Sequence, residues 1–202
     1  MTVEPTSRVG RPRDPDKHSA VLEAARELLA EGGYAAATIS AIARRAEVGT
    51  PTIYRRWPRR ETLIEDAVFG HRRLIAPAPG ADLHATLTEW VRMFLSHLAE
   101  PATRAAIPGL LVAYQTDADL YRFLLARVED EVRTQLTDII GSETPLSDPG
   151  QRAARADAVF DTLVGITFTR ALTFGSADID DFCQSTADTL VALTASPWAP
   201  DR

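Results

Sequence analysis

The amino-acid sequence predicts an all-α fold, in which a small N-terminal unit of three helices is joined to a larger helical body. Apolar residues recur at three- and four-residue spacing along most of the 202-residue chain, as they do on the buried face of a helix. No stretch shows the alternation of apolar and polar residues that is typical of a strand. Gly and Pro residues divide the chain into segments of helical length, so about nine helices are expected in total.

The first helix is expected from about Pro15 to Glu31. It should end at Gly32-Gly33, because Gly adopts the left-handed backbone conformation that commonly closes a helix. Its apolar residues share one face, and they are Val21, Leu22, Ala25, Leu28 and Leu29. We expect this face to brace the two short helices that follow.

Two short helices joined by a tight turn are expected between Thr38 and Trp57. The hydroxyl of Thr38 is placed to cap the first helix. Pro51 suits the first position of the second helix, where its missing N–H costs nothing, and Thr50 before it can cap. The inward residues of the first helix are Ile39, Ile42, Ala43 and Ala46. This pattern is typical of a helix-turn-helix, whose second helix reads DNA from the major groove.

The second of these helices carries polar side chains on an outward face. Successive side chains turn by roughly 100°, so Ile53 points inward while Pro51, Thr52 and Arg55 point away from it. Arg55 is a candidate base reader, because Arg can bind guanine O6 and N7 together. Tyr54 lies on the flank, and a core aromatic residue with its hydroxyl at the surface is the alternative interpretation.

Charge is distributed unevenly along the chain, although the total is 22 Lys plus Arg against 28 Asp plus Glu. Residues 1–60 carry eleven basic and seven acidic side chains, a net charge of +4, so the remainder carries −10. Three Arg pairs lie between residues 38 and 60, and Arg44 and Arg56 in these pairs are further candidate DNA contacts. A basic end on an acidic body favours binding to nucleic acid. A solvated charged face is the alternative for an isolated pair.

Residues 17–63 resemble the DNA-binding segment of the TetR family of bacterial transcriptional regulators. The matching positions are the helix before Gly32-Gly33-Tyr34, then Thr38, Ile42-Ala43, Ala46, Val48, Thr52-Ile53-Tyr54, Trp57, Arg60 and Leu63. The resemblance implies an all-helical homodimer with an N-terminal helix-turn-helix domain and a C-terminal ligand-binding and dimerisation domain. Glu47 departs from the Gly that is common in this turn, so either the turn avoids positive φ or it tolerates strain of about 1 kcal/mol.

The resemblance also implies roles for individual side chains. The residues that would hold phosphates are Thr38, Thr52, Tyr54 and Arg60. The residues that would approach bases are Ser40, Thr50 and Pro51. Arg60 replaces the common Lys and keeps the phosphate-binding charge. Phosphate contacts fix the register of the protein on DNA, whereas base contacts carry the sequence information.

A basic arm of residues 1–14 precedes the first helix. The run Arg8-Val-Gly-Arg11-Pro-Arg13 is too rich in Pro, Gly and charge to pack a core of its own. Arg11 and Arg13 are candidates for minor-groove contacts, because guanidinium groups enter narrow, electronegative grooves. A solvated tail is the alternative.

The remaining helices are expected to form the larger body. A fourth helix, from Arg59 or Arg60 to Ile75, should link the two units. The break at residues 77–80 then divides the chain into a DNA-binding domain, 15–76, and a ligand-binding and dimerisation domain, 77–202. Pro108 should kink or split the helix that follows Pro101. The further helices are expected at 83–99, 101–115, 117–141, 151–174 and 178–194, with a loop at 142–150.

Aromatic and polar side chains of the body are candidates for an effector pocket. They are Trp90, Phe94, His97, Tyr114, Tyr121, Phe160, Thr167 and Arg170. The resemblance implies a pocket among the central helices that binds a small, mostly apolar molecule and thereby changes the spacing of the two recognition helices. Ordinary core packing is the alternative for these residues, because aromatic side chains at helical spacing also fill cores.

The resemblance places a homodimer interface on the last two helices. Its candidate residues are Val159, Leu163, Ile166, Phe174, Phe182, Leu190 and Leu193. A two-fold dimer would place its recognition helices about 34 to 36 Å apart, or a multiple of that distance, and would require a palindromic operator in double-stranded DNA. A core position within one protomer is the alternative for each of these residues.

Other classes of protein find little support. No apolar run approaches the roughly 18 residues that a membrane span requires, and no apolar signal segment opens the chain, so we expect no membrane association and a cytoplasmic location. Cys183 is the single Cys, and the four His residues show no metal-ligand spacing with it, so neither a disulfide, a metal nor a cofactor is expected. No catalytic motif indicates an enzyme.

The sequence therefore predicts a ligand-responsive transcriptional regulator, a repressor that binds its operator as a homodimer and is released by a small-molecule effector. A helical small-molecule-binding protein without specific control of DNA is the alternative.

Overall fold

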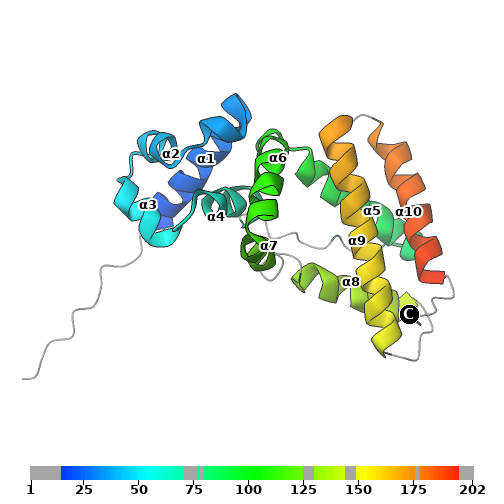
Figure 1. Cartoon of the computed structure of the whole chain (residues 1–202). Helices are drawn as coiled ribbons and strands as arrows, with labels where there is room; N and C mark the ends of the chain where they lie inside the picture. Colours follow the sequence, from blue (N-terminus) through cyan, green and yellow to red (C-terminus); the bar gives the residue numbers. More distant parts are fainter. Residues whose placement is uncertain are drawn as a thin grey trace, which may run out of the picture.

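The computed structural model describes residues 15–70, 77, 80–124, 130–143, 149–175 and 178–195, and the regular structure of these residues is entirely helical (Figure 1). The elements are α1 (Pro15–Ala36), α2 (Ile39–Arg45), α3 (Thr50–Arg56), α4 (Arg60–Glu65), the π-helical η1 (Asp66–Gly70), α5 (Leu83–Leu98), α6 (Pro101–Thr116), α7 (Ala118–Leu124), α8 (Asp130–Glu143), α9 (Pro149–Thr173) and α10 (Ile179–Ala195). The all-α prediction is confirmed.

The described residues contain ten α-helices, whereas the sequence predicts about nine. The difference arises between residues 117 and 141, where one helix is expected. The structure has two helices there, α7 and α8, and residues 125–129 between them lie outside the described part of the chain.

Helix α1 changes direction at Gly33. The helical segment continues to Ala36, but Gly33 has φ 73° and ψ −172°, which are not helical values. Only Gly adopts such angles without steric cost, because it has no Cβ. The expected end of the first helix at Gly32-Gly33 therefore corresponds to a sharp break, after which a short helical piece leads into α2.

The DNA-binding unit has its own hydrophobic core, which α1 to α4 build together. Leu22 and Leu29 of α1, Ile42 of α2, Ile53 of α3 and Leu63 of α4 are each at most 1% exposed in this core. Burying one such side chain contributes roughly 1.5 to 3 kcal/mol to stability. The small helices, two of them only seven residues long, thus depend on this shared core for their stability.

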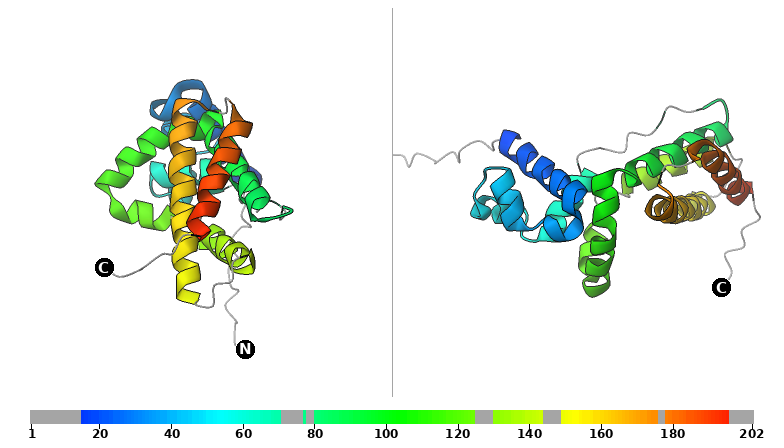
Figure 2. Two further views of the ribbon diagram at one scale, coloured as in Figure 1. Left: turned by 90° about the vertical axis from the view of Figure 1, so that its right-hand side faces the viewer. Right: turned by 90° about the horizontal axis from the view of Figure 1, so that it is seen from above.

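Helix α6 belongs to both parts of the molecule. Its residues Ala102, Ala106 and Leu110 pack into the core of the DNA-binding unit, although they lie beyond the predicted boundary at residue 77. Gly109 allows the close approach, since a Cβ there would lie 2.2 Å from Cγ of Tyr34 at the end of α1. In Figure 1 and in the right-hand view of Figure 2, α6 stands between the N-terminal helices and the body.

The predicted split at Pro108 is wrong, because α6 continues through it from Pro101 to Thr116. Pro lacks the N–H for one helical hydrogen bond, which normally disrupts a helix. Here Ile107 and Leu110 on either side of Pro108 are both 1% exposed. Packing on both sides of Pro108 therefore supports a continuous helix.

The body consists of α5, α8, α9 and α10. Its core contains Trp90 of α5, Leu136 of α8, Leu163 of α9 and Leu190 of α10, all fully buried. Helices α9 and α10 run side by side and pack on α5 (Figures 1 and 2). No helix among the described residues is both long and apolar enough to cross a membrane.

Candidate DNA-binding surface and ligand pocket

The first helix of the helix-turn-helix begins as its sequence predicts. Thr38 has an extended backbone, and its Oγ1 accepts a hydrogen bond from the backbone N–H of Ala41 at 3.1 Å. This bond satisfies one of the N–H groups that the first turn of a helix leaves without a partner. Thr38 caps α2 as expected.

The recognition helix α3 begins one residue earlier than predicted. Gly49, with φ −65° and ψ 137°, is the residue that caps it, so Thr50 and Pro51 occupy the first and second helical positions. The capping role predicted for the Thr50 side chain is therefore wrong, and Gly49 supplies no side-chain hydrogen bond. Pro51 remains in the first turn, where its missing N–H has no helical partner to lose.

The turn between α2 and α3 adopts the left-handed conformation at Glu47. Its φ is 53°, so Glu47 takes the backbone geometry for which Gly is normally used. The N–H of Val48 donates to the carbonyl oxygen of Ala43 at 3.0 Å, which closes the turn around it. Of the two possibilities that the sequence leaves open, the structure shows the strained one, with a cost of about 1 kcal/mol.

The outward face of α3 agrees with the helical wheel. Ile53 is fully buried, while Pro51, Arg55 and Arg56 are exposed. Tyr54 is 53% exposed, which rules out the interpretation that it is a core residue. The other predicted contact residues also reach the surface: Thr38, Ser40 and Arg44 are exposed, and Thr50 and Thr52 are partly exposed.

Arg45 in this segment serves the fold. Arg45 forms ion pairs with Glu27 at 2.9 Å and Glu31 at 2.8 Å, both on α1. The Arg45 guanidinium lowers the pKa of the Glu31 carboxyl through this hydrogen bond. Among the described residues, no carboxylate pairs with Arg44, Arg55 or Arg56, so their charges remain available to an anionic partner.

Arg60 is held by backbone groups. Its Nε donates to the carbonyl oxygen of Ala37 at 2.9 Å, its Nη2 donates to that of Tyr34, and its guanidinium lies 4.2 Å from the centre of the Tyr34 ring. These contacts tie the end of α1 to the first turn of α4. Sequence reasoning missed this structural role, and the phosphate contact that the resemblance implies for Arg60 stays a prediction.

Trp57 anchors the end of the recognition helix. It is 4% exposed, its Nε1 donates to Asp66 Oδ2 at 2.6 Å, and its ring stacks on His18 with centroids 5.2 Å apart. The guanidinium of Arg56 lies 5.4 Å from the centre of the Trp57 ring. This aromatic anchor fixes α3 against both α1 and η1, and so orients the outward face.

A cavity of about 640 Å³ lies where the body meets α6, α7 and η1. It brings together five of the eight predicted pocket residues. These are Phe94, His97, Tyr114, Tyr121 and Phe160. None of the described lining residues is Lys, Arg, Asp or Glu, so the cavity favours an uncharged, apolar ligand.

The other three predicted pocket residues do not line this cavity. Trp90 is fully buried in the core, 6.2 Å from Phe94 between ring centroids. The buried hydroxyl of Thr167 donates to the Leu163 carbonyl at 2.6 Å. Arg170 lies against Phe174 and Phe182. Helical spacing does not reveal which buried face of a helix borders a cavity, so it could not separate these three residues from the five that line it.

Phe69 is the lining residue whose position matters most, and sequence reasoning missed it. It lies in η1, directly after α4, and packs against the core of the DNA-binding unit as well as against a small buried cluster formed by Leu95, Leu98, Ile107 and Ala171. A π-helical turn shifts the register of the residues that follow, so the 3.6-residue pattern could not place Phe69 on this face.

Tyr114 connects the cavity to α4. Its ring lines the cavity, and its hydroxyl faces Glu65, which is fully buried. Burial is the main cause that raises the pKa of Tyr114, and the nearby Glu65 carboxyl raises it further. The Tyr114 hydroxyl therefore stays protonated beside the Glu65 carboxyl.

The predicted dimer residues fall into two groups. Val159, Leu163 and Leu190 are fully buried within the protomer, so they are core residues and cannot contact a second copy. Phe174 is 67% exposed. The remaining residues, Ile166, Phe182 and Leu193, are partly exposed.

The arm with Arg11 and Arg13 lies outside the described residues. No cluster of metal-binding side chains is found in the described part of the chain.

A helix-turn-helix with an exposed, basic outward face, joined through one helix to an apolar cavity, defines a DNA-binding regulator of the ligand-responsive class. The chain belongs to the TetR family: residues 21–67 match the bacterial regulatory proteins of the tetR family, and residues 77–190 match the tetracyclin repressor-like C-terminal domain. It is thus a TetR-family transcriptional regulator with a DNA-binding and a ligand-binding domain.

Individual relatives agree with this assignment. The chain is 39% identical over 84 residues to the HTH-type transcriptional regulator YdeS of Bacillus subtilis, an alignment that covers 41% of this chain and 42% of YdeS. It is 25% identical to the HTH-type transcriptional regulator Rv1556 of Mycobacterium tuberculosis over 95% of this chain and 96% of that protein. The crystal structure of the TetR family regulator SCO0332 superposes with a TM-score of 0.64 and 26% identity, over 88% of this chain and 97% of SCO0332.

Proposed function

We propose that the protein is a repressor that binds a palindromic operator as a homodimer and is released by an uncharged, largely apolar effector. One observation carries the proposal. The apolar cavity is lined by Phe69 and Tyr114, and both residues also pack against the core of the DNA-binding unit. A ligand that displaces either ring therefore acts directly on the helices that hold α3.

The DNA contacts are proposed from exposure and charge. Arg55 reads a base from the outward face of α3, with Thr50 and Pro51 close to the groove. Arg44, Arg56 and Tyr54 contact the backbone around it. The further proposed phosphate contacts are Thr38 and Thr52, and Ser40 is a further base contact. Arg11 and Arg13 of the arm enter the minor groove.

The dimer interface is proposed on the exposed parts of α9 and α10. Phe174, directly after α9, is 67% exposed, and Ile166 of α9 and Leu193 of α10 are partly exposed. A two-fold interface of this kind gives the two recognition helices a fixed separation, which a palindromic operator matches. We propose a cytoplasmic location and no catalytic activity, because every chemical feature described serves binding.

Selection of genomic fragments with the purified protein tests the DNA part of the proposal. A regulator yields a short palindrome, bound with an affinity well above that for random DNA. A helical binding protein without control of DNA would give only non-specific, strongly salt-dependent binding or none. Sedimentation at micromolar concentration tests the dimer, and a monomer would contradict it.

A matched pair of variants tests the effector part. Leu111 lines the cavity and is 41% exposed, while the adjacent Val112 does not line it and is 62% exposed. Compounds that release the operator are first found in a panel of uncharged apolar molecules. We expect Leu111→Trp to narrow the cavity and reduce the response at least tenfold, while Val112→Trp keeps it. An equal response of both variants would place the effector elsewhere.

A further inference from the structure

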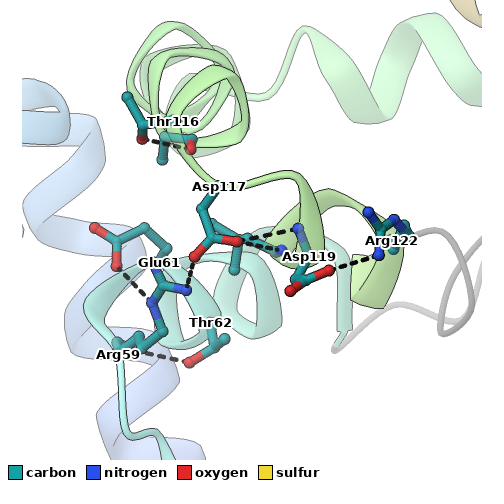
Figure 3. Close-up of polar contacts among 9 residues, drawn as sticks. Arg59, Glu61, Thr62, Thr116, Asp117, Asp119 and Arg122 are labelled. Atoms are coloured by element: carbon teal, nitrogen blue, oxygen red, sulfur yellow. Dashed lines mark hydrogen bonds and ion pairs between the residues drawn. The ribbon is translucent and has the colours of Figure 1, made fainter.

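Arg59 and Asp117 form an ion pair that joins the two parts of the molecule at a second point. Arg59 Nη1 donates to Asp117 Oδ2 at 2.5 Å, across 58 positions in the sequence (Figure 3). Arg59 lies between α3 and α4, and Asp117 lies between α6 and α7. The pair therefore connects two turns: the corner between α3 and α4, residues 57–59, and the elbow between α6 and α7, at Asp117.

Asp117 organises the elbow as well as pairing with Arg59. Its backbone N–H donates to the Ala113 carbonyl at 3.0 Å and closes α6. Its Oδ1 accepts from the backbone N–H groups of Asp119 at 3.0 Å and Leu120 at 3.2 Å, at the start of α7. The backbone N–H of Asp117 thus closes one helix, while its carboxylate caps the next helix and holds Arg59 (Figure 3). The Arg59 hydrogen bond, followed by that from Leu120, lowers the pKa of Asp117.

Arg59 organises its own corner in the same way. It is the residue that caps α4, and its carbonyl oxygen accepts from Thr62 Oγ1 at 2.8 Å and from the Leu63 N–H at 3.4 Å. The last residue of α3 is Arg56, so only two residues separate Arg59 from the recognition helix. A displacement of the Arg59 backbone is therefore transmitted to α3 over a very short length of chain.

The elbow that Asp117 fixes is part of the cavity wall. Tyr114 comes from the last turn of α6 and Tyr121 from α7, and their ring centroids lie 5.3 Å apart. A molecule that separates these two rings changes the angle between α6 and α7. Because Asp117 lies at the vertex of this angle, the change reaches Arg59 through the ion pair.

The exposure of the pair indicates that it fixes geometry more than it stabilises the fold. The side chains of Arg59 and Asp117 are 45% and 32% exposed, and ion pairs with such access to water contribute little to stability. Apolar packing of α6 on α1 already holds the two parts together. That contact involves buried residues between 102 and 110 and the partly buried Tyr114, and Asp117 adds a polar contact where α6 ends.

We propose that Arg59 and Asp117 are positioning residues for operator binding. Their ion pair holds the DNA-binding unit at a fixed angle to the ligand-binding body. The operator measurements below rest on the proposed function, whereas the exchange measurement does not. Without the pair, the corner after α3 samples more positions. The fraction of molecules in the binding-competent arrangement falls, and the apparent affinity falls with it.

Hydrogen exchange of the full-length protein tests the positioning directly. Asp117→Asn keeps an oxygen that can cap α7 but removes the nearer of two carboxylates beside Arg59, the other being Glu61, whose Oε2 lies 3.9 Å from Arg59 Nε. Asp119→Asn is the matched control, because it breaks the neighbouring Asp119–Arg122 pair, 2.6 Å long and confined to α7. We expect Asp117→Asn alone to speed exchange in peptides covering residues 57–65. Equal exchange of this corner in both variants would overturn the proposal.

Charge reversal provides a rescue. Arg59→Asp and Asp117→Arg each place like charges at the contact, and the double variant restores an attractive pair. We expect each single variant to speed exchange in residues 57–65 and the double variant to slow it again. If the double variant is no slower than the faster single variant, the contact does not fix the corner and the proposal fails.

Operator binding separates positioning from a direct phosphate contact. We expect Asp117→Asn to weaken binding to the selected operator by about 3- to 10-fold and to change binding to random DNA by less than about twofold. If Asp117 instead restrains an Arg59 that contacts phosphate, Asp117→Asn tightens binding to all DNA, and this result overturns the proposal. If selection yields no operator, the proposed function fails, while the exchange result still decides whether the pair fixes the corner.

Discussion

Helix α3 of the DNA-binding unit has seven residues and packs against one core, whereas α9 of the body has 25 residues and packs against α5, α8 and α10 and borders the cavity. In α3, Ile53 is buried and Arg55 is exposed, as the helical wheel predicts. In α9, Phe160 lines the cavity but Thr167 is buried away from it. A helix with one buried face reveals its outward residues through periodicity alone, while a helix with several buried faces does not.

The two regions also use charge differently. In the DNA-binding unit, internal partners hold Arg45, Arg59 and Arg60, which leaves Arg44, Arg55 and Arg56 for the outer surface. In the described lining of the cavity there is no charged side chain. The first region recognises a charged partner through its surface, and the second excludes charge from its interior.

The joint between the two regions offers the largest expected effect. Gly109→Ala would place a Cβ 2.2 Å from Cγ of Tyr34, and the Arg60 guanidinium on the Tyr34 ring limits where the ring can move. We expect the free energy of unfolding to fall by about 1 to 3 kcal/mol, measured by denaturant titration. If the variant is as stable as the wild type, the DNA-binding unit and α6 do not share one core.

Gly165→Ala in the body is the control for this substitution. A Cβ at Gly165 meets no atom within 4 Å, although the residue is also within a helix. Replacing an exposed helical Gly by Ala stabilises a helix by about 0.5 to 1 kcal/mol. The two Gly→Ala variants are therefore expected to change stability in opposite directions.

Arg55→Ala tests whether the outward face of α3 reads sequence. Loss of a bidentate contact to guanine is expected to weaken operator binding by about 1 to 3 kcal/mol and to relax the preference at one base pair. Affinities for the operator and its single-base variants, measured at one salt concentration, give both quantities. Arg122→Ala, in the body, is the control. A uniform loss on every sequence would show that Arg55 contacts phosphate instead.

The sequence was sufficient to predict the all-helical architecture and the outward face of α3 in the DNA-binding unit, because both depend on local periodicity and capping. Thr38, Ile53 and Arg55 lie as predicted for this reason. The cavity was predictable only in part. Phe69 reaches it through a π-helical turn, and Arg59 meets Asp117 through the packing of α6 on α1, and neither arrangement leaves a periodic pattern in the sequence.

Backbone strain allows a smaller test that again compares the two regions. Glu47 in the DNA-binding unit and Asp178 before α10 both have positive φ, 53° and 47°. Glu47→Gly is expected to raise the free energy of unfolding by about 0.5 to 1 kcal/mol, since relief of strain exceeds the added entropy of the unfolded chain. Asp178→Gly should gain less, because Asp adopts this conformation more readily. Thermal unfolding of the two variants provides the comparison, and a larger gain at Asp178 would contradict it.

The smallest expected effect distinguishes two adjacent Arg residues at the end of α2. Arg44 is exposed, whereas Arg45 is paired with Glu27 and Glu31. If Arg44 neutralises a phosphate, Arg44→Gln should lower the slope of log affinity against log salt by about one unit. Arg45→Gln should change the slope less, because the wild-type side chain already has carboxylate partners and releases no counterion from DNA. Titrations of operator DNA at several salt concentrations measure both slopes. Equal changes in the two slopes would mean that the α1 carboxylates release Arg45 when DNA binds. The internal ion pairs of Arg45 would then be exchanged for phosphate contacts instead of being kept.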